Sequence, residues 1–129
     1  MKKGLFYFAF IMILIGCISV SVLHAEEDIL GTWEGTTSVP DMGDVGLTLL
    51  LEKIEEGYIG KISDTSGIMD NTEISDIDFT NNELSFNFLF DNGYSAVMVD
   101  MILKVEGNKL TGYWQAGGDS AAVELEKKV

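Results

Sequence analysis

Residues Glu83–Val105 read ELSFNFLF-DNG-YSAVMVDMILKV and carry the clearest structural pattern in the chain. Apolar and polar side chains alternate along Glu83–Phe90, and this period of two is typical of a β-strand with one buried face. The next three residues, Asp91–Gly93, favour a tight turn because Asn and Gly tolerate positive φ angles. A second strand-like run, Tyr94–Val105, follows directly. The stretch therefore predicts an antiparallel β-hairpin.

The period of two also predicts which face of each hairpin strand is buried. Leu84, Phe86, Phe88 and Phe90 share the apolar face of the first strand. In the second strand, two sets of alternating residues compete for the interior. We favour the more apolar set, which places Asp100 in solvent and avoids burying an unpaired acid. This set comprises Val97, Val99, Met101 and Leu103.

Similar strand-like runs with turn signals continue in both directions from the hairpin, and no sustained helical period occurs after residue 26. The other runs are Ile29–Thr37, Gly46–Ile54, Tyr58–Asp64, Thr72–Phe79, Lys109–Gln115 and Ser120–Lys127. Their short, even spacing predicts an all-β domain over residues 26–129, a single antiparallel up-and-down β-barrel of about eight strands. Glycines within the runs suit a tightly coiled barrel, in which a missing side chain lets a strand bend. These glycines are Gly31, Gly35, Gly60 and Gly112.

Residues 1–25 have the layout of a secretory signal, and we expect them to form a signal helix before the barrel. Two lysines precede an apolar run, Leu5–Leu23, and small Ala25 stands at the expected cleavage point. Cys17 offers an alternative, because LIGC resembles a lipobox whose cysteine is lipidated and becomes the mature N-terminus. An uncleaved membrane anchor is a third alternative. All three predict an extracytoplasmic protein, periplasmic or secreted, whose membrane contact is limited to the signal or a lipid anchor.

The composition excludes several classes of function. The formal net charge is −13 and the chain has no arginine, which disfavours nucleic acid and anionic membrane surfaces as partners. The only cysteine and the only histidine, Cys17 and His24, precede the domain. The domain therefore has no disulfide, no Cys or His zinc site and no histidine-activated nucleophile. We expect no enzymatic activity and no cofactor.

Acidic side chains gather in one region, yet they do not form a recognisable metal loop. Oxygen-rich clusters suit calcium, but the chain lacks an Asp-x-Asp-x-Asp-Gly pattern, and we predict no metal site. The acids concerned are Asp64, Asp70, Glu73, Asp76 and Asp78.

A short motif in the first predicted strand resembles the signature of a known group of barrels. Gly31-Thr32-Trp33 resembles the Gly-x-Trp signature at the first strand of lipocalin-like barrels, and the domain is similar to small exported bacterial members of that group. The resemblance implies that Trp33 closes one barrel end beneath a basic side chain near the last strand, Lys127 or Lys128. The chain is shorter than most lipocalins and shows no second signature.

These observations lead to two hypotheses about function. The first is a non-enzymatic binding module with a pocket for a small apolar or amphipathic ligand at the barrel mouth. Its candidate ligand-binding residues are Phe86, Phe88, Tyr94 and Trp114. The second is a solid-core envelope structural or protein-interaction module without a ligand, whose protein partner the sequence does not identify. Small inward residues would indicate the first, and leucine and phenylalanine in every layer would indicate the second.

Overall fold

The computed structural model describes residues 29–128, which form an all-β domain without a helix. The proposed signal helix, Cys17 and the cleavage point lie outside the described residues. The strands are β1 (Gly31–Val39), β2 (Gly43–Ile54), β3 (Gly57–Asp64), β4 (Thr72–Glu73), β5 (Ser75–Thr80), β6 (Glu83–Asp91), β7 (Ala96–Glu106), β8 (Lys109–Ala116) and β9 (Asp119–Lys127). The predicted all-β antiparallel architecture is confirmed.

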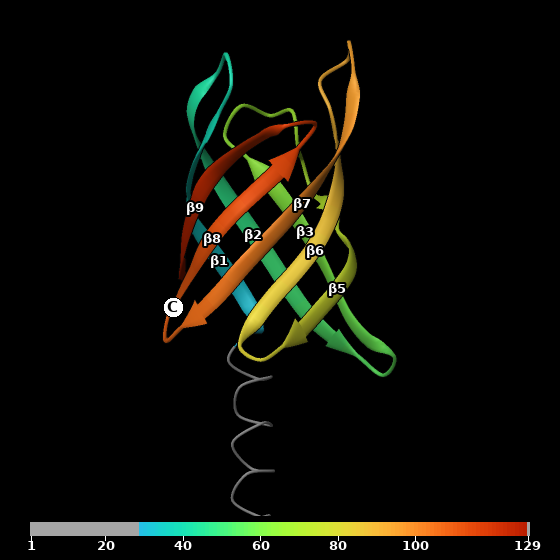
Figure 1. Cartoon of the computed structure of the whole chain (residues 1–129). Helices are drawn as coiled ribbons and strands as arrows, with labels where there is room; N and C mark the ends of the chain where they lie inside the picture. Colours follow the sequence, from blue (N-terminus) through green and yellow to red (C-terminus); the bar gives the residue numbers. More distant parts are fainter. Residues whose placement is uncertain (1–28, 129) are drawn as a thin grey trace, which may run out of the picture.

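The strands form one antiparallel sheet that curls into a nearly closed barrel (Figure 1). Each strand except β4 and β5 lies between two hydrogen-bonded neighbours, in the order β4-β3-β2-β1-β9-β8-β7-β6-β5. The first and last strands, β1 and β9, pair through contacts such as Trp33 with Lys127. The sheet therefore closes at its chain ends, and its two edges are consecutive segments in the middle of the chain. Both edge strands are short, with two residues in β4 and six in β5, which limits the unpaired backbone that would otherwise invite aggregation.

The expected strand Thr72–Phe79 was wrong in one respect, because the structure divides it into β4 and β5. Asp76 has a φ of 53°, and the pairing of β5 with β6 shifts register between Ser75 and Asp78. The chain crosses from β3 to β6 just before this kink, because Glu73 pairs with β3 and Ser75 already pairs with β6, so that one segment supplies both edges of the sheet. Ile74 lies at the crossing, where its side chain is buried and its amide donates a 3.1 Å hydrogen bond to the carbonyl oxygen of Gly60.

Three of the predicted strand glycines mark places where neighbouring strands come too close for a side chain. A Cβ atom on Gly112 would lie 1.9 Å from the carbonyl oxygen of Ile102, and one on Gly35 would lie 1.8 Å from that of Glu124. On Gly60 it would lie 2.6 Å from the carbonyl oxygen of Leu50. Real side chains do not tolerate these separations, so glycine is required for the tight coiling of the barrel.

The hairpin that decided the fold prediction is present, with one boundary corrected. β7 begins at Ala96, and Tyr94 belongs to the loop before it. The side-chain oxygen of Asn92 accepts hydrogen bonds from the amides of Tyr94 (3.0 Å) and Ser95 (2.9 Å), which holds both residues in a turn. The predicted inward face of the second strand is confirmed for its buried residues Val99, Met101 and Leu103, and Asp100 is exposed.

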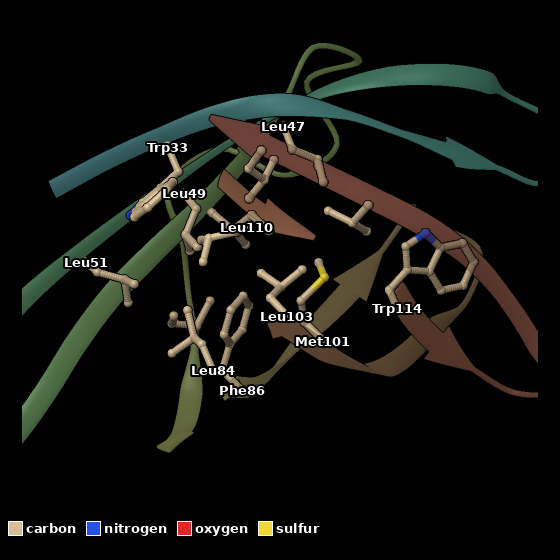
Figure 2. Close-up of a cluster of buried hydrophobic side chains, with 14 of the residues drawn as sticks. Trp33, Leu47, Leu49, Leu51, Leu84, Phe86, Met101, Leu103, Leu110 and Trp114 are labelled. Carbon is tan, nitrogen blue, oxygen red and sulfur yellow. The ribbon is translucent and has the colours of Figure 1, made fainter. Parts of the chain in front are cut away.

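Apolar side chains fill the half of the barrel around Trp33 (Figure 2). We call this half the closed end; it carries the β2–β3, β5–β6 and β7–β8 turns. Trp33 is fully buried, and its Nε1 atom donates a 3.0 Å hydrogen bond to the carbonyl oxygen of Ile29. The Nζ atom of Lys127 lies 5.6 Å from the centroid of the Trp33 ring, within the range of a cation–π interaction. The core here is solid, with its fully buried side chains at Leu49, Leu51, Ile62, Leu84, Leu103, Leu110 and Leu125.

Candidate functional site

The opposite end of the barrel, which we call the mouth, contains a cavity of about 430 Å³. Four connections gather there, namely β1–β2, β3–β4, β6–β7 and β8–β9 (Figure 1). Each contributes to the cavity lining, through Asp41, Met69, Asn92 and Gly117 respectively. The volume lies within the range of roughly 300–1,000 Å³ that is typical of small-molecule sites.

The wall of the cavity is mainly apolar. Its apolar side chains come from most strands of the barrel and include Val39, Val45, Leu47, Met69, Phe88, Phe90, Val97, Val99, Met101, Trp114 and Ala116. Along β8, Leu110 is fully buried in the core at the closed end, whereas Trp114 and Ala116, nearer the mouth, line the cavity. The barrel is thus filled at its closed end and hollow at its mouth.

Two hydrogen bonds fix the indole of Trp114 in this wall. Its Nε1 atom donates to Oγ1 of Thr37 at 3.0 Å, and that hydroxyl donates in turn to the carbonyl oxygen of Ala122 at 2.7 Å. Thr37 is the one buried polar residue among residues 29–128, and both its hydrogen bonds are short and well formed. Within the same residues, no buried side-chain nitrogen or oxygen lacks a partner. The inner wall therefore offers a ligand apolar contact and no unpaired polar atom.

The structure places only two of the four proposed ligand-binding residues in the cavity wall. Phe88 and Trp114 line it. Phe86 shares their inward direction, with its ring centroid 6.2 Å from that of Phe88, but it is buried in the core below. Tyr94 points away, and its side chain is 99% exposed because the Asn92 turn removes it from the strand.

Sequence reasoning missed several residues of the wall. Thr37 occupies an inward position of β1, and the alternation from Trp33 could have identified it as buried. Met69 lies in the β3–β4 connection, where no strand period applies. Its amide donates a 2.9 Å hydrogen bond to Oδ1 of Asp64, and this contact folds the connection against the barrel. Only the tertiary structure brings Met69 to the mouth.

Polar groups of the cavity are concentrated at its rim. Asp41, Asp64 and Asp119 contribute carboxylates, and Asn92 and Ser95 contribute further polar groups. No lysine of residues 29–128 lines the cavity. An apolar chamber with a polar, acidic entrance has the geometry to receive a small molecule that carries both apolar and polar parts.

The described residues hold no group of three or more histidine, cysteine, aspartate or glutamate side chains placed to bind a metal ion. The same part of the chain contains no helix with the length and apolarity needed to cross a membrane.

Comparison with known proteins gives no relative for this chain. No family model matches the sequence, and neither a curated protein nor a solved structure is similar enough to count as a match.

Proposed function

We propose that this protein is an extracytoplasmic, non-enzymatic binding module that holds a small apolar or amphipathic molecule in the cavity at the barrel mouth. The observation that carries the proposal is the cavity itself, a chamber of about 430 Å³ with mainly apolar walls and with its carboxylates at the entrance. Burial of apolar ligand surface would supply affinity, at about 25 cal/mol for each Å² removed from water. The rim would orient the polar part of the ligand.

The location outside the cytoplasm is proposed from residues 1–25, with their basic start, apolar middle and small residue at the exit. Membership of the lipocalin-like barrels is likewise a proposal, supported by Gly31-Thr32-Trp33 and by Lys127 above the Trp33 ring. The absence of histidine and cysteine after residue 25 supports a role in binding over catalysis.

Native mass spectrometry of the protein purified from its own host tests the proposal most directly. We expect a fraction of the protein to carry a small organic molecule that is released by solvent extraction. Titration of the extracted protein with neutral alkyl alcohols, followed through tryptophan emission, provides a second measurement. An unliganded mass together with no saturable binding of any alkyl probe would contradict the proposal.

A protein-interaction role is the second candidate, and a specific surface favours it. The β6–β7 hairpin extends past its neighbours, since β7 pairs with β8 only up to Asp100 and β5 pairs with β6 only up to Asn87. Its outward face carries exposed Leu89 and Met98, which form a cross-strand pair, and Tyr94 at the tip. Replacement of these apolar side chains by polar ones would weaken the binding of a protein partner without changing the cavity. This result would distinguish a protein-interaction role from small-molecule binding.

A further inference from the structure

We propose that the ligand of the mouth cavity carries a positive charge, so that this site selects cationic amphiphiles, such as long-chain amines, over fatty-acid anions. This inference rests on the proposed binding function and adds to it the chemical class of the ligand. Its basis is the distribution of charge along the barrel axis relative to the cavity.

The charged groups at the mouth are all acidic. The aspartates near this end are Asp41, Asp44, Asp64, Asp70, Asp91 and Asp119. The lysines of residues 29–128 lie elsewhere. Lys53, Lys104, Lys109, Lys127 and Lys128 are toward the closed end, and Lys61 is midway along β3.

The carboxylates that line the cavity differ in whether they have hydrogen-bond partners within the protein. Asp64 is engaged, because its Oδ1 atom accepts the amide of Met69 and its Oδ2 atom accepts the hydroxyl of Ser66. The carboxylates of Asp41 and Asp119 have no hydrogen-bond or ion-pair partner among residues 29–128. Two carboxylates at the cavity entrance are thus left to interact with whatever enters.

Both free carboxylates stand on firmly placed backbone. Asp41 lies in the β1–β2 turn, which is closed by a 3.0 Å hydrogen bond from the amide of Met42 to the carbonyl oxygen of Val39. Asp119 is the first residue of β9 and pairs with Ala116 of β8, itself a cavity residue. The backbone therefore places both carboxylates at the entrance, where their side chains are exposed.

The combination of these charges with an apolar chamber determines the selectivity. A cleft lined by one sign of charge, with walls of low dielectric constant, concentrates the field and raises the local concentration of the opposite charge. An alkyl carboxylate would place its charge beside Asp41 and Asp119 with no lysine to compensate for the repulsion. An alkylammonium would place its charge at the same point with attraction and its chain against Phe88, Trp114 and their neighbours.

The test compares three probes that share one chain length and differ in charge, namely decylamine, decanol and decanoate, each below its micelle concentration. Binding to the exported protein is measured by isothermal titration calorimetry at neutral pH. We expect decylamine to bind about tenfold or more tightly than decanol, and decanoate to bind more weakly than either. A rise in ionic strength from about 0.01 to about 1 M should remove most of the difference, because the Debye length falls from about 30 to about 3 Å.

Two double variants distinguish the effect of the rim carboxylates on affinity from the effect of the overall charge of −13. The double variant Asp41→Asn/Asp119→Asn should lose about tenfold in affinity for decylamine and keep its affinity for decanol. The matched control Asp100→Asn/Glu106→Gln removes the same charge from exposed sites outside the cavity and should change neither.

Each outcome decides a different claim. Equal affinity for decylamine and decanol, or equal losses in both double variants, would overturn the charge inference and leave the binding function standing. Saturable binding of none of the three probes would overturn the binding function, and the charge inference with it.

Discussion

The indole Nε1 atom of Trp114 donates a 3.0 Å hydrogen bond to the hydroxyl of Thr37, a residue 77 positions earlier in the chain. The contact spans β9, because β8 and β1 both pair with that strand. It joins the first strand to the eighth and holds an aromatic wall residue of the cavity in place. Both residues are buried, with 8% of Trp114 and 6% of Thr37 exposed.

Replacement of Thr37 by valine should therefore destabilise the domain. The variant keeps the volume of the side chain but leaves the buried N–H of Trp114 and the carbonyl of Ala122 without their partner. We expect a loss of about 1–3 kcal/mol in the free energy of unfolding, measured by urea denaturation. Thr36→Val, at the exposed neighbouring position, is the control and should change stability little. Equal stability of the two variants would show that the buried pair contributes nothing.

Gly112→Ala should be among the most damaging single substitutions in the domain. Its Cβ atom would lie 1.9 Å from the carbonyl oxygen of Ile102, so that β7 and β8 would have to separate. We expect a cost of about 3 kcal/mol or more, or loss of the folded state, measured by circular dichroism during thermal unfolding. Gln115→Ala, on the exposed face of the same strand, serves as the control. A Gly112→Ala protein as stable as this control would contradict the close approach of β7 and β8.

The cation above Trp33 should contribute to stability at the closed end. Lys127→Met keeps the apolar stem over the ring and removes the charge, and we expect a loss of about 0.5–1 kcal/mol. Lys128→Met removes an exposed ion pair with Glu34 instead, whose small contribution should disappear in high salt. The comparison is made by chemical denaturation at two salt concentrations. A Lys127 effect that disappeared entirely with salt would indicate a surface ion pair in place of the ring interaction.

Filling the mouth should abolish binding without loss of the fold. Ala116→Leu adds a branched side chain at a cavity position, where there is empty space to receive it. We expect unchanged or slightly higher thermal stability and at least about a tenfold loss of affinity for the alkyl probes. Ala122→Leu, which points outward from β9, should bind the probes normally. Undiminished binding in Ala116→Leu would place the ligand elsewhere.

The signal-like residues 1–25 allow a separate prediction about where the mature chain begins. We expect the intact mass of the protein exported by its own host to correspond to a chain that begins at Glu26. A mass that corresponds to a chain beginning at a diacylated Cys17 would establish the lipobox alternative, and an unprocessed chain would establish the membrane anchor. Cys17→Ser distinguishes the first two, because only the lipoprotein needs the thiol.

Local patterns along the chain were enough to predict most strands of this protein. The alternation in Glu83–Phe90 and the Asp91–Gly93 turn were enough to predict a hairpin, because a period of two and a positive-φ turn are local properties of the chain. The strand glycines and the solvated Asp100 followed from the same local rules. The same rules could not divide the run Thr72–Phe79, because its division at Ile74 depends on where β3 and β6 lie.

The position of the cavity, in contrast, is a property of the tertiary structure. Whether an eight- or nine-stranded barrel is filled depends on the summed volumes of inward side chains from strands that are distant in sequence. The strand register is needed to place Leu110 at the closed end and Ala116 at the mouth. Tertiary folding likewise brings Thr37 to Trp114, and it places Asp41 and Asp119 at the same rim. Strand periodicity is local and can be read along the chain, whereas a cavity is the volume left by residues that only folding brings together.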